Sequence, residues 1–178
     1  PGESVNIVSP TLEIEGTLTE TDRAYVEAAR GLGLHDYMLS YVERAEDVEE
    51  VRALDPKARV VLKIESVRGI DLARSAHATL GRLMAARGDL YVEVLQPHRV
   101  LAALRELIQA DPEAIAASRI LTSLAFGDVP EEQDITDVAY LLSLGYRTLM
   151  LGDEVCLKRD SVLSALNLLE AIAGEVRP

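Results

Sequence analysis

The chain alternates between short runs of apolar residues and longer segments in which apolar residues recur every three or four positions. Short continuous apolar runs are typical of strands buried on both faces, and the longer spacing predicts amphipathic helices. The predicted strands span residues 37–42, 60–65, 82–86, 120–124 and 148–151. The predicted helices span residues 19–30, 45–54, 66–79, 99–110, 130–145 and 161–173. A strand followed by a helix, repeated in this way, indicates an α/β fold with a parallel sheet.

Doubly wound sheets and β/α barrels are both built from such units, and in both the active site lies where the strands end. Polar residues follow most of the predicted strands, which suits the mouth of a barrel. A complete TIM barrel needs ~250 residues, whereas this chain has 178 residues and about five strand–helix units. We therefore expect a partial, incomplete TIM barrel of the parallel β/α type. It forms one domain over residues 1–178, with residues 1–18 as a lead-in segment.

Composition and charge narrow the class of protein further. The chain has 18 Lys and Arg against 30 Asp and Glu, a net charge of −12. Nucleic-acid backbones are bound by clustered positive charge, so we expect no nucleic-acid partner. No apolar run is long enough to cross a membrane, the first residues lack signal-peptide features, and the single Cys156 allows no internal disulfide. We expect a cytoplasmic protein without a membrane partner that acts on a small molecule.

A lysine and a glutamate close the second predicted strand. Side chains two positions apart on a strand point the same way, so Lys63 and Glu65 project together while Ile64 packs oppositely. Charged residues on a core-facing strand are costly unless they are paired, bound to a ligand or placed at a mouth. The pair is therefore either a structural ion pair or part of a functional site.

A second group of polar residues closes the next strand. Gly88 permits a sharp turn after Arg87, and Asp89 then lies at the mouth; an ordinary capped turn is the alternative. Glu65 and Asp89 are separated by one strand–helix–strand unit and so end neighbouring strands. Two converging carboxylates without histidine or thiolate predict Mg²⁺ or Mn²⁺. Lys63 beside them would stabilise negative charge that develops on a metal-bound oxygen.

Residues 60–69 and 83–93, read together, resemble the central signature of the pyruvate kinase family in order and spacing. The likeness extends to residues 18–22, 40–48, 130–139 and 150–154, and corresponds to the C-terminal part of that family's barrel domain. The resemblance implies Lys63 as the cation that stabilises the transferred phosphoryl group and the enolate. It implies Glu65 and Asp89 as ligands of the divalent metal. Ala86, Arg87, Gly88 and Asp89 would form the turn that receives the substrate carboxylate through backbone amides.

The resemblance also implies a catalytic hydroxyl after the family's seventh strand, expected at Thr122, with Ser123 beside it in substrate binding. A K⁺ ion follows from the resemblance alone. The family's substrate arginine, its monovalent-cation ligands and much of its nucleotide site lie in parts that the likeness does not reach. We therefore do not expect a complete ADP site in this chain alone.

The resulting hypothesis is a kinase-type transferase of glycolysis. It would act on phosphoenolpyruvate and pyruvate by phosphoryl transfer through a metal-bound enolate. The chain would be a segment of a larger protein, or an oligomer or partner segment would complete its barrel. Two alternatives remain open: a metal-dependent aldolase or lyase of the same superfamily, and a non-catalytic homologue that binds a 2-oxo acid or serves as a scaffold.

Overall fold

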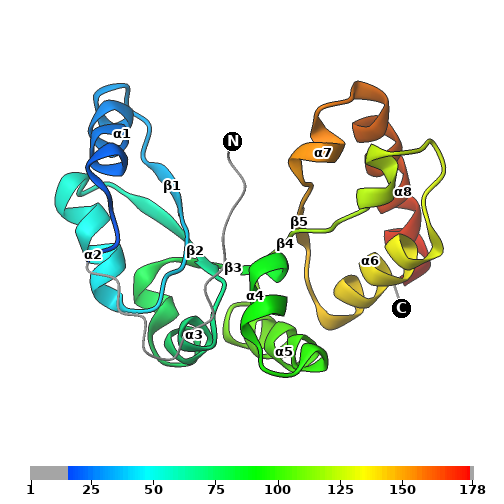
Figure 1. Cartoon of the computed structure of the whole chain (residues 1–178), viewed down its shortest axis with the longest axis horizontal. Helices are drawn as coiled ribbons and strands as arrows, with labels where there is room; N and C mark the ends of the chain where they lie inside the picture. Colours follow the sequence, from blue (N-terminus) through cyan, green and yellow to red (C-terminus); the bar gives the residue numbers. More distant parts are fainter. Residues whose placement is uncertain (1–15, 177–178) are drawn as a thin grey trace.

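The computed structural model describes residues 16–176, so most of the predicted lead-in segment lies outside the described residues. The strands are β1 (Asp36–Leu39), β2 (Arg59–Ile64), β3 (Arg82–Ala86), β4 (Ile115–Ala117) and β5 (Thr148–Met150). The helices are α1 (Glu20–Gly31), α2 (Ala45–Leu54), α3 (Val67–Leu80), α4 (Arg87–Glu93), α5 (Val100–Ala110), α6 (Glu132–Leu144), α7 (Asp153–Cys156) and α8 (Arg159–Val176). Two short 3₁₀ helices, η1 (Pro97–Arg99) and η2 (Thr122–Ala125), complete the described elements (Figure 1).

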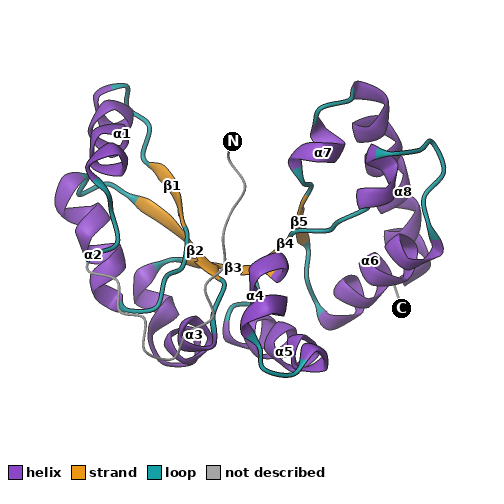
Figure 2. Cartoon of the chain, viewed as in Figure 1, coloured by secondary structure: helices purple, strands orange, loops and turns teal. Residues whose placement is uncertain are grey.

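The five strands form one parallel sheet in the order β1-β2-β3-β4-β5, so each strand lies beside its neighbour in sequence. The sheet is curved, and the long helices lie along its outer side (Figure 2). Sequential parallel strands with helices outside are the arrangement of a β/α barrel. The structure therefore confirms the predicted α/β fold of the partial-barrel type.

The sheet has a different packing environment on each face. Its outer face shares the main core with the helices, and Leu62, Ile64 and Leu83 are fully buried there. The inner face carries a smaller apolar cluster centred on Met84 and Ala117. Because strand residues alternate between faces, Lys63 falls on the inner face between the buried Leu62 and Ile64.

Several local signals in the sequence are confirmed at helix ends. Thr19 caps α1, its hydroxyl accepts a hydrogen bond from the amide of Asp22, and the Asp22 carboxylate accepts one from the amide of Thr19. α2 spans the predicted residues 45–54, and Gly145 ends α6 with a left-handed conformation. None of the described helices is long and apolar enough to cross a bilayer.

The predicted fourth strand is wrong. Residues 120–124 were expected to form it, but β4 is the shorter run Ile115–Ala117, and η2 begins at Thr122. Ser118, Arg119 and Leu121 have positive φ angles of 70°, 57° and 52°, which end the extended conformation directly after β4. The branched residues around Ile120 are buried, but they pack as an irregular turn rather than as a strand.

Two short helices were not predicted. Arg87, Gly88 and Asp89 were expected to form a turn, and they form the first turn of the seven-residue helix α4. The residues around Asp153 were expected as a loop and form the four-residue helix α7. Neither helix has a side-chain hydrogen bond at its N-cap, so the sequence carries no capping signal that would predict it.

Candidate metal and substrate site

Lys63 and Glu65 meet at the carboxyl end of β2. The Lys63 Nζ atom lies 2.9 Å from Glu65 Oε1 and donates a second hydrogen bond to Ser40 Oγ at 2.9 Å. The Glu65 side chain is 2% exposed, whereas a quarter of the Lys63 side chain reaches solvent. The side chains of Lys63 and Glu65 therefore point the same way, as predicted, and Lys63 remains accessible from the inner side of the sheet.

The end of β1 holds the other oxygen of the Glu65 carboxylate. The backbone amide of Tyr41 donates a hydrogen bond to Glu65 Oε2 at 2.6 Å. Tyr41 itself has a φ of 51°, an uncommon conformation for a large residue, in the turn that follows β1. Glu65 is thus fixed by one neighbouring strand end and by its own strand.

Burial raises the pKa of Glu65; hydrogen bonds from Lys63 and the Tyr41 amide oppose this rise, and the charge of Asp89 adds to it. Burial likewise raises the pKa of Tyr41 to about 12, with further contributions from the negative charges of Asp89 and Glu65. The negative charge of Asp89 thus contributes to the pKa of both Glu65 and Tyr41, in agreement with the predicted placement of Glu65 and Asp89 on neighbouring strand ends. Such a concentration of negative charge favours a bound cation.

Asp89 lies in the first turn of α4, directly after β3. The residue before it, Gly88, faces Ser118: a Cβ atom on Gly88 would lie 3.5 Å from both Cβ and Oγ of Ser118. Ala86 is the last residue of β3 and pairs with Ala117 of β4. The segment 86–89 is therefore placed at the same edge of the sheet as Lys63 and Glu65, as predicted.

The Arg87 side chain points into the protein. Its Nη1 atom lies 2.6 Å from Asp137 Oδ1 of α6, and Nη2 donates to the carbonyl oxygen of Ser118 at 2.6 Å. Nε donates to the carbonyls of Ala117 and Ser118 at 3.3 and 3.2 Å. The side chain is 10% exposed. Arg87 therefore fastens the start of α4 to the end of β4 and to α6.

Thr122 and Ser123 lie in η2, several residues beyond the end of β4. The hydroxyl and amide of Ser123 both donate to Asp134 Oδ2 of α6, and its hydroxyl accepts from the amide of Glu131. Ser123 is thereby engaged in fixing the start of α6. Among residues 16–176, no hydrogen bond joins Thr122 or Ser123 to Lys63, Glu65 or Asp89.

Ser118 is the hydroxyl residue that directly follows β4, and the sequence analysis did not single it out. Since the strand was expected at residues 120–124 and β4 ends at Ala117, the end of the strand was placed seven residues too late. Lys63 and Asp89 both lie within three residues of the end of a strand, and Ser118 is the hydroxyl residue within the same distance of the end of β4. This closeness to a strand end is the signal that favours Ser118.

The donor set suits a divalent cation with oxygen ligands. Within residues 16–176, no group of three or more His, Cys, Asp or Glu side chains is gathered around one point. Mg²⁺ is usually bound by only one or two carboxylates and completes its shell with water and substrate oxygens. Glu65 and Asp89 fit that pattern, and they do not suit zinc, which prefers nitrogen and sulfur ligands.

The fold and the site together define a segment of a β/α barrel with a lysine–carboxylate cluster at the carboxyl edge of its sheet. A family model described as the pyruvate kinase barrel domain matches residues 2–158. The chain belongs to the pyruvate kinase family.

Curated relatives give the same result. The pyruvate kinase of Thermotoga maritima is 29% identical over 182 residues, which cover 96% of this chain and 38% of that protein. The enzyme of Thermoplasma acidophilum is 29% identical over 174 residues, or 93% of this chain and 32% of that protein. Pyruvate kinase 2 of Saccharomyces cerevisiae is 31% identical over 149 residues, covering 79% and 29%. The chain thus spans about a third of the length of these relatives.

Proposed function

We propose that this chain supplies the metal and enolate site of a pyruvate-kinase-type enzyme that acts on phosphoenolpyruvate and pyruvate. The observation that supports the proposal is the Lys63–Glu65 pair at the end of β2, with Asp89 directly after the neighbouring strand β3. Membership of the pyruvate kinase family supports this substrate class. The proposal concerns the domain over residues 1–178, which holds part of the complete active site.

Glu65 and Asp89 are the proposed ligands of Mg²⁺ or Mn²⁺. A bound divalent ion would polarise the carboxylate and oxo group of the substrate and offset the negative charge that develops there. Glu65 is suited to this role because Lys63 and the Tyr41 amide fix both of its oxygens in place. A ligand that is already ordered loses little conformational freedom when the ion binds.

Lys63 is the proposed cation that stabilises the enolate of pyruvate and the phosphoryl group in transfer. Its ammonium group is anchored to Glu65 and Ser40 and is still partly accessible. A fixed positive charge beside the reacting oxygens acts most strongly when their negative charge increases, in the transition state.

The segment 86–89 is the proposed binding site for the substrate carboxylate, through backbone amides at the start of α4. Gly88 lies beside Ser118, which brings this segment against the end of β4. For the catalytic hydroxyl we propose Ser118 in place of Thr122, since Ser118 lies at the end of β4 and against Gly88. Its hydroxyl would move a proton to or from the methyl carbon of pyruvate.

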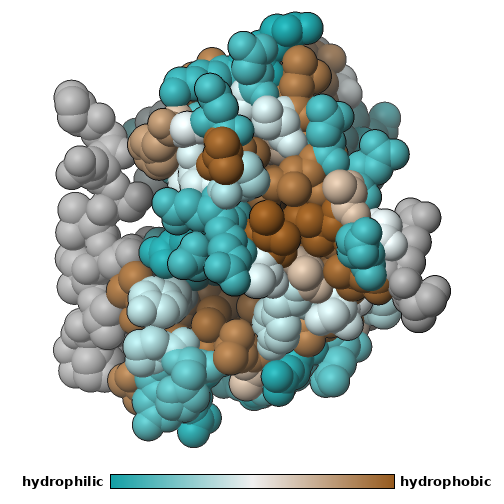
Figure 3. Space-filling model, turned by 90° about the vertical axis from the view of Figure 1, so that its right-hand side faces the viewer, coloured by the Kyte–Doolittle hydropathy of each residue, from teal (hydrophilic) through white to brown (hydrophobic). Residues whose placement is uncertain are grey.

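The rest of the active site is proposed to come from elsewhere. Within residues 16–176, β1 and β5 each have one unpaired edge, which leaves the barrel open between them. Apolar side chains also gather on the side of the molecule shown in Figure 3. Ile135 of α6 and Leu163 and Leu166 of α8 are among the exposed apolar residues. An oligomer or a further segment would cover these surfaces and contribute the sites for ADP and K⁺.

Titration of Mn²⁺, followed by its paramagnetic effect on water relaxation, tests the metal site. We expect Asp89→Ala to weaken Mn²⁺ binding at least about tenfold, because loss of a ligand costs no less than loss of an outer partner. Asp160→Ala removes a carboxylate that is 92% exposed and should leave Mn²⁺ binding unchanged. Oxalate, which resembles the enolate of pyruvate, should tighten binding to the wild type. Equal binding of Mn²⁺ by all three proteins would contradict the assignment.

A further inference from the structure

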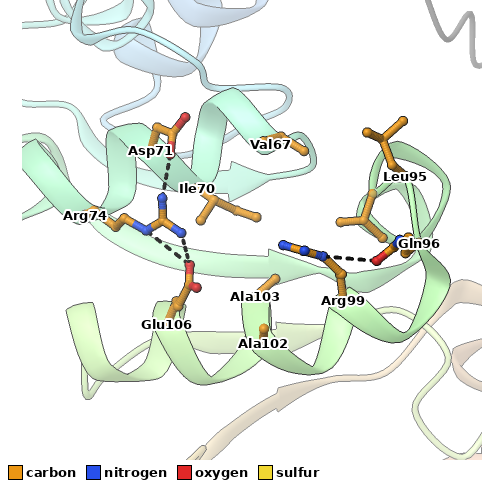
Figure 4. Close-up of a pocket in the computed structure, with 11 residues that line it drawn as sticks. Val67, Ile70, Asp71, Arg74, Leu95, Gln96, Arg99, Ala102, Ala103 and Glu106 are labelled. Carbon is orange, nitrogen blue, oxygen red and sulfur yellow. Dashed lines mark hydrogen bonds and ion pairs between the residues drawn. The ribbon is translucent and has the colours of Figure 1, made fainter.

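A groove lies between α3 and α5, separate from the carboxylates described above. It has a volume of about 380 Å³ and is bounded at one end by the segment that links α4 to η1 (Figure 4). Its walls are apolar, formed by Val67 and Ile70 of α3, Val94 and Leu95 of the linking segment, and Ala102 and Ala103 of α5. This volume is within the range of small-molecule sites, which combine apolar walls with a few polar groups.

At one end of the groove, two carboxylates neutralise the positive charge of Arg74. The Arg74 guanidinium lies 2.6 Å from Asp71 Oδ1 and donates through Nε to Glu106 Oε2 at 3.1 Å. Figure 4 shows these three side chains together at one end of the groove. Two carboxylates around one arginine leave this end unsuited to an additional anion.

The other end carries Arg99, for which residues 16–176 supply no carboxylate partner. Arg99 makes one long hydrogen bond, from Nε to Gln96 Oε1 at 3.4 Å, and no ion pair with any residue in the described range. Its guanidinium points into the space between the two helices (Figure 4). The chain has a net charge of −12, so an arginine that no carboxylate of the described part of the chain neutralises is an uncommon feature beside apolar walls.

We propose that this groove binds a small monocarboxylate with an apolar body. The carboxylate would accept paired hydrogen bonds from the guanidinium of Arg99, whose planar fork matches carboxylate geometry. The apolar body would lie against Ile70 and Ala103, which are nearly buried beneath the groove. A second negative charge on the ligand would meet Asp71 and Glu106, so a monoanion is favoured over a dianion.

Titration with straight-chain carboxylates tests the proposed ligand class. Butyrate, hexanoate and octanoate should bind with affinity that rises about twofold to fourfold for each methylene group that the groove covers. Octylamine, which has the same apolar chain and the opposite charge, should bind at least tenfold more weakly than octanoate. Binding is measured by the chemical-shift changes of amides in α3 and α5.

Two variants and a matched control locate the binding. Arg99→Gln should weaken octanoate binding about tenfold, because it removes a charged hydrogen-bond donor. Ala102→Phe places a large side chain on an exposed wall and should block the groove without disturbing the core. Arg105→Gln, on α5 but outside the groove, should bind octanoate like the wild type.

Other results would overturn the proposal. Octanoate and octylamine binding equally, or octanoate binding unaffected by Arg99→Gln and Ala102→Phe, would mean non-specific association. Absence of any octanoate binding would exclude a site for this ligand class. A dimer by light scattering that dissociates in Leu95→Asp, with no octanoate binding, would identify a second copy of this chain as the occupant. None of these outcomes depends on the metal site, because Glu65 and Asp89 do not line the groove.

Discussion

Replacement of Arg87 by alanine should destabilise the protein far more than loss of an ordinary surface arginine. The Arg87 side chain is 10% exposed and has hydrogen bonds to two backbone carbonyls and to Asp137. Removal of one partner from a buried charge network typically costs ~3–5 kcal/mol. Since a third of the Asp137 side chain reaches solvent, that carboxylate can be rehydrated, and we expect a loss at the lower limit, about 3 kcal/mol.

Urea denaturation followed by far-ultraviolet circular dichroism measures this loss. A loss of about 3 kcal/mol lowers the melting temperature by roughly 6–12 °C in a chain of this size. Arg59→Ala is the matched control, because Arg59 also pairs with an aspartate, through Nε at 2.6 Å from Asp36 Oδ1. Both of those side chains are more than two-thirds exposed, so the control should lose less than about 1 kcal/mol.

Two further variants separate charge from geometry. Arg87→Lys keeps the positive charge but cannot reach Asp137 and both carbonyls with one planar group, and should recover only part of the lost stability. In a double-mutant cycle with Asp137→Ala, the two losses should be non-additive by about 1 kcal/mol. The reasoning fails if Arg87→Ala is no more destabilising than Arg59→Ala.

The remaining predictions concern catalysis, assembly and acid stability. If this domain enolises pyruvate, Lys63→Met should greatly slow proton exchange at the methyl group, measured by NMR, while Mn²⁺ affinity stays nearly unchanged; undiminished exchange would exclude Lys63 as the stabilising cation. β1 and β5 each have one edge that pairs with no strand within residues 16–176, and these edges should pair with another chain or segment. A monodisperse, cooperatively folded monomer by light scattering would contradict this expectation. Burial raises the pKa of Asp47, but hydrogen bonds from Thr17 and from two backbone amides outweigh burial and lower this pKa below its ordinary 3.8. Asp47 therefore stabilises the fold above pH 3.8 and loses this effect as the pH falls, so the stability difference between wild type and Asp47→Asn should narrow in acid.

The sequence alone was sufficient for much of the fold. Four of the five strands and the six longer helices lie close to their predicted positions, because their apolar residues follow a clear period. β4 was misplaced because Ile-Ala-Ala is too short and too small to stand out as a strand, whereas the branched residues near Ile120 resemble one. The same shift explains why the sequence analysis named Thr122 for the catalytic hydroxyl, whereas we propose Ser118. An irregular turn with three left-handed residues has no periodic signal that would have prevented it.

What the sequence by itself determined is the direction of neighbouring side chains. Lys63 and Glu65 had to project together because strand geometry repeats every two residues, and Asp89 had to follow the next strand because one strand–helix unit separates it from Glu65. Only the tertiary structure decided the surroundings of each group: that Glu65 is buried and held by Tyr41, that Arg87 points inward to Asp137, and that Ser118 faces Gly88. The direction of a side chain is set by local backbone geometry. Burial and hydrogen-bond partners depend on residues 24 to 50 positions apart in the chain, and only the packing of the helices on the sheet brings these residues together.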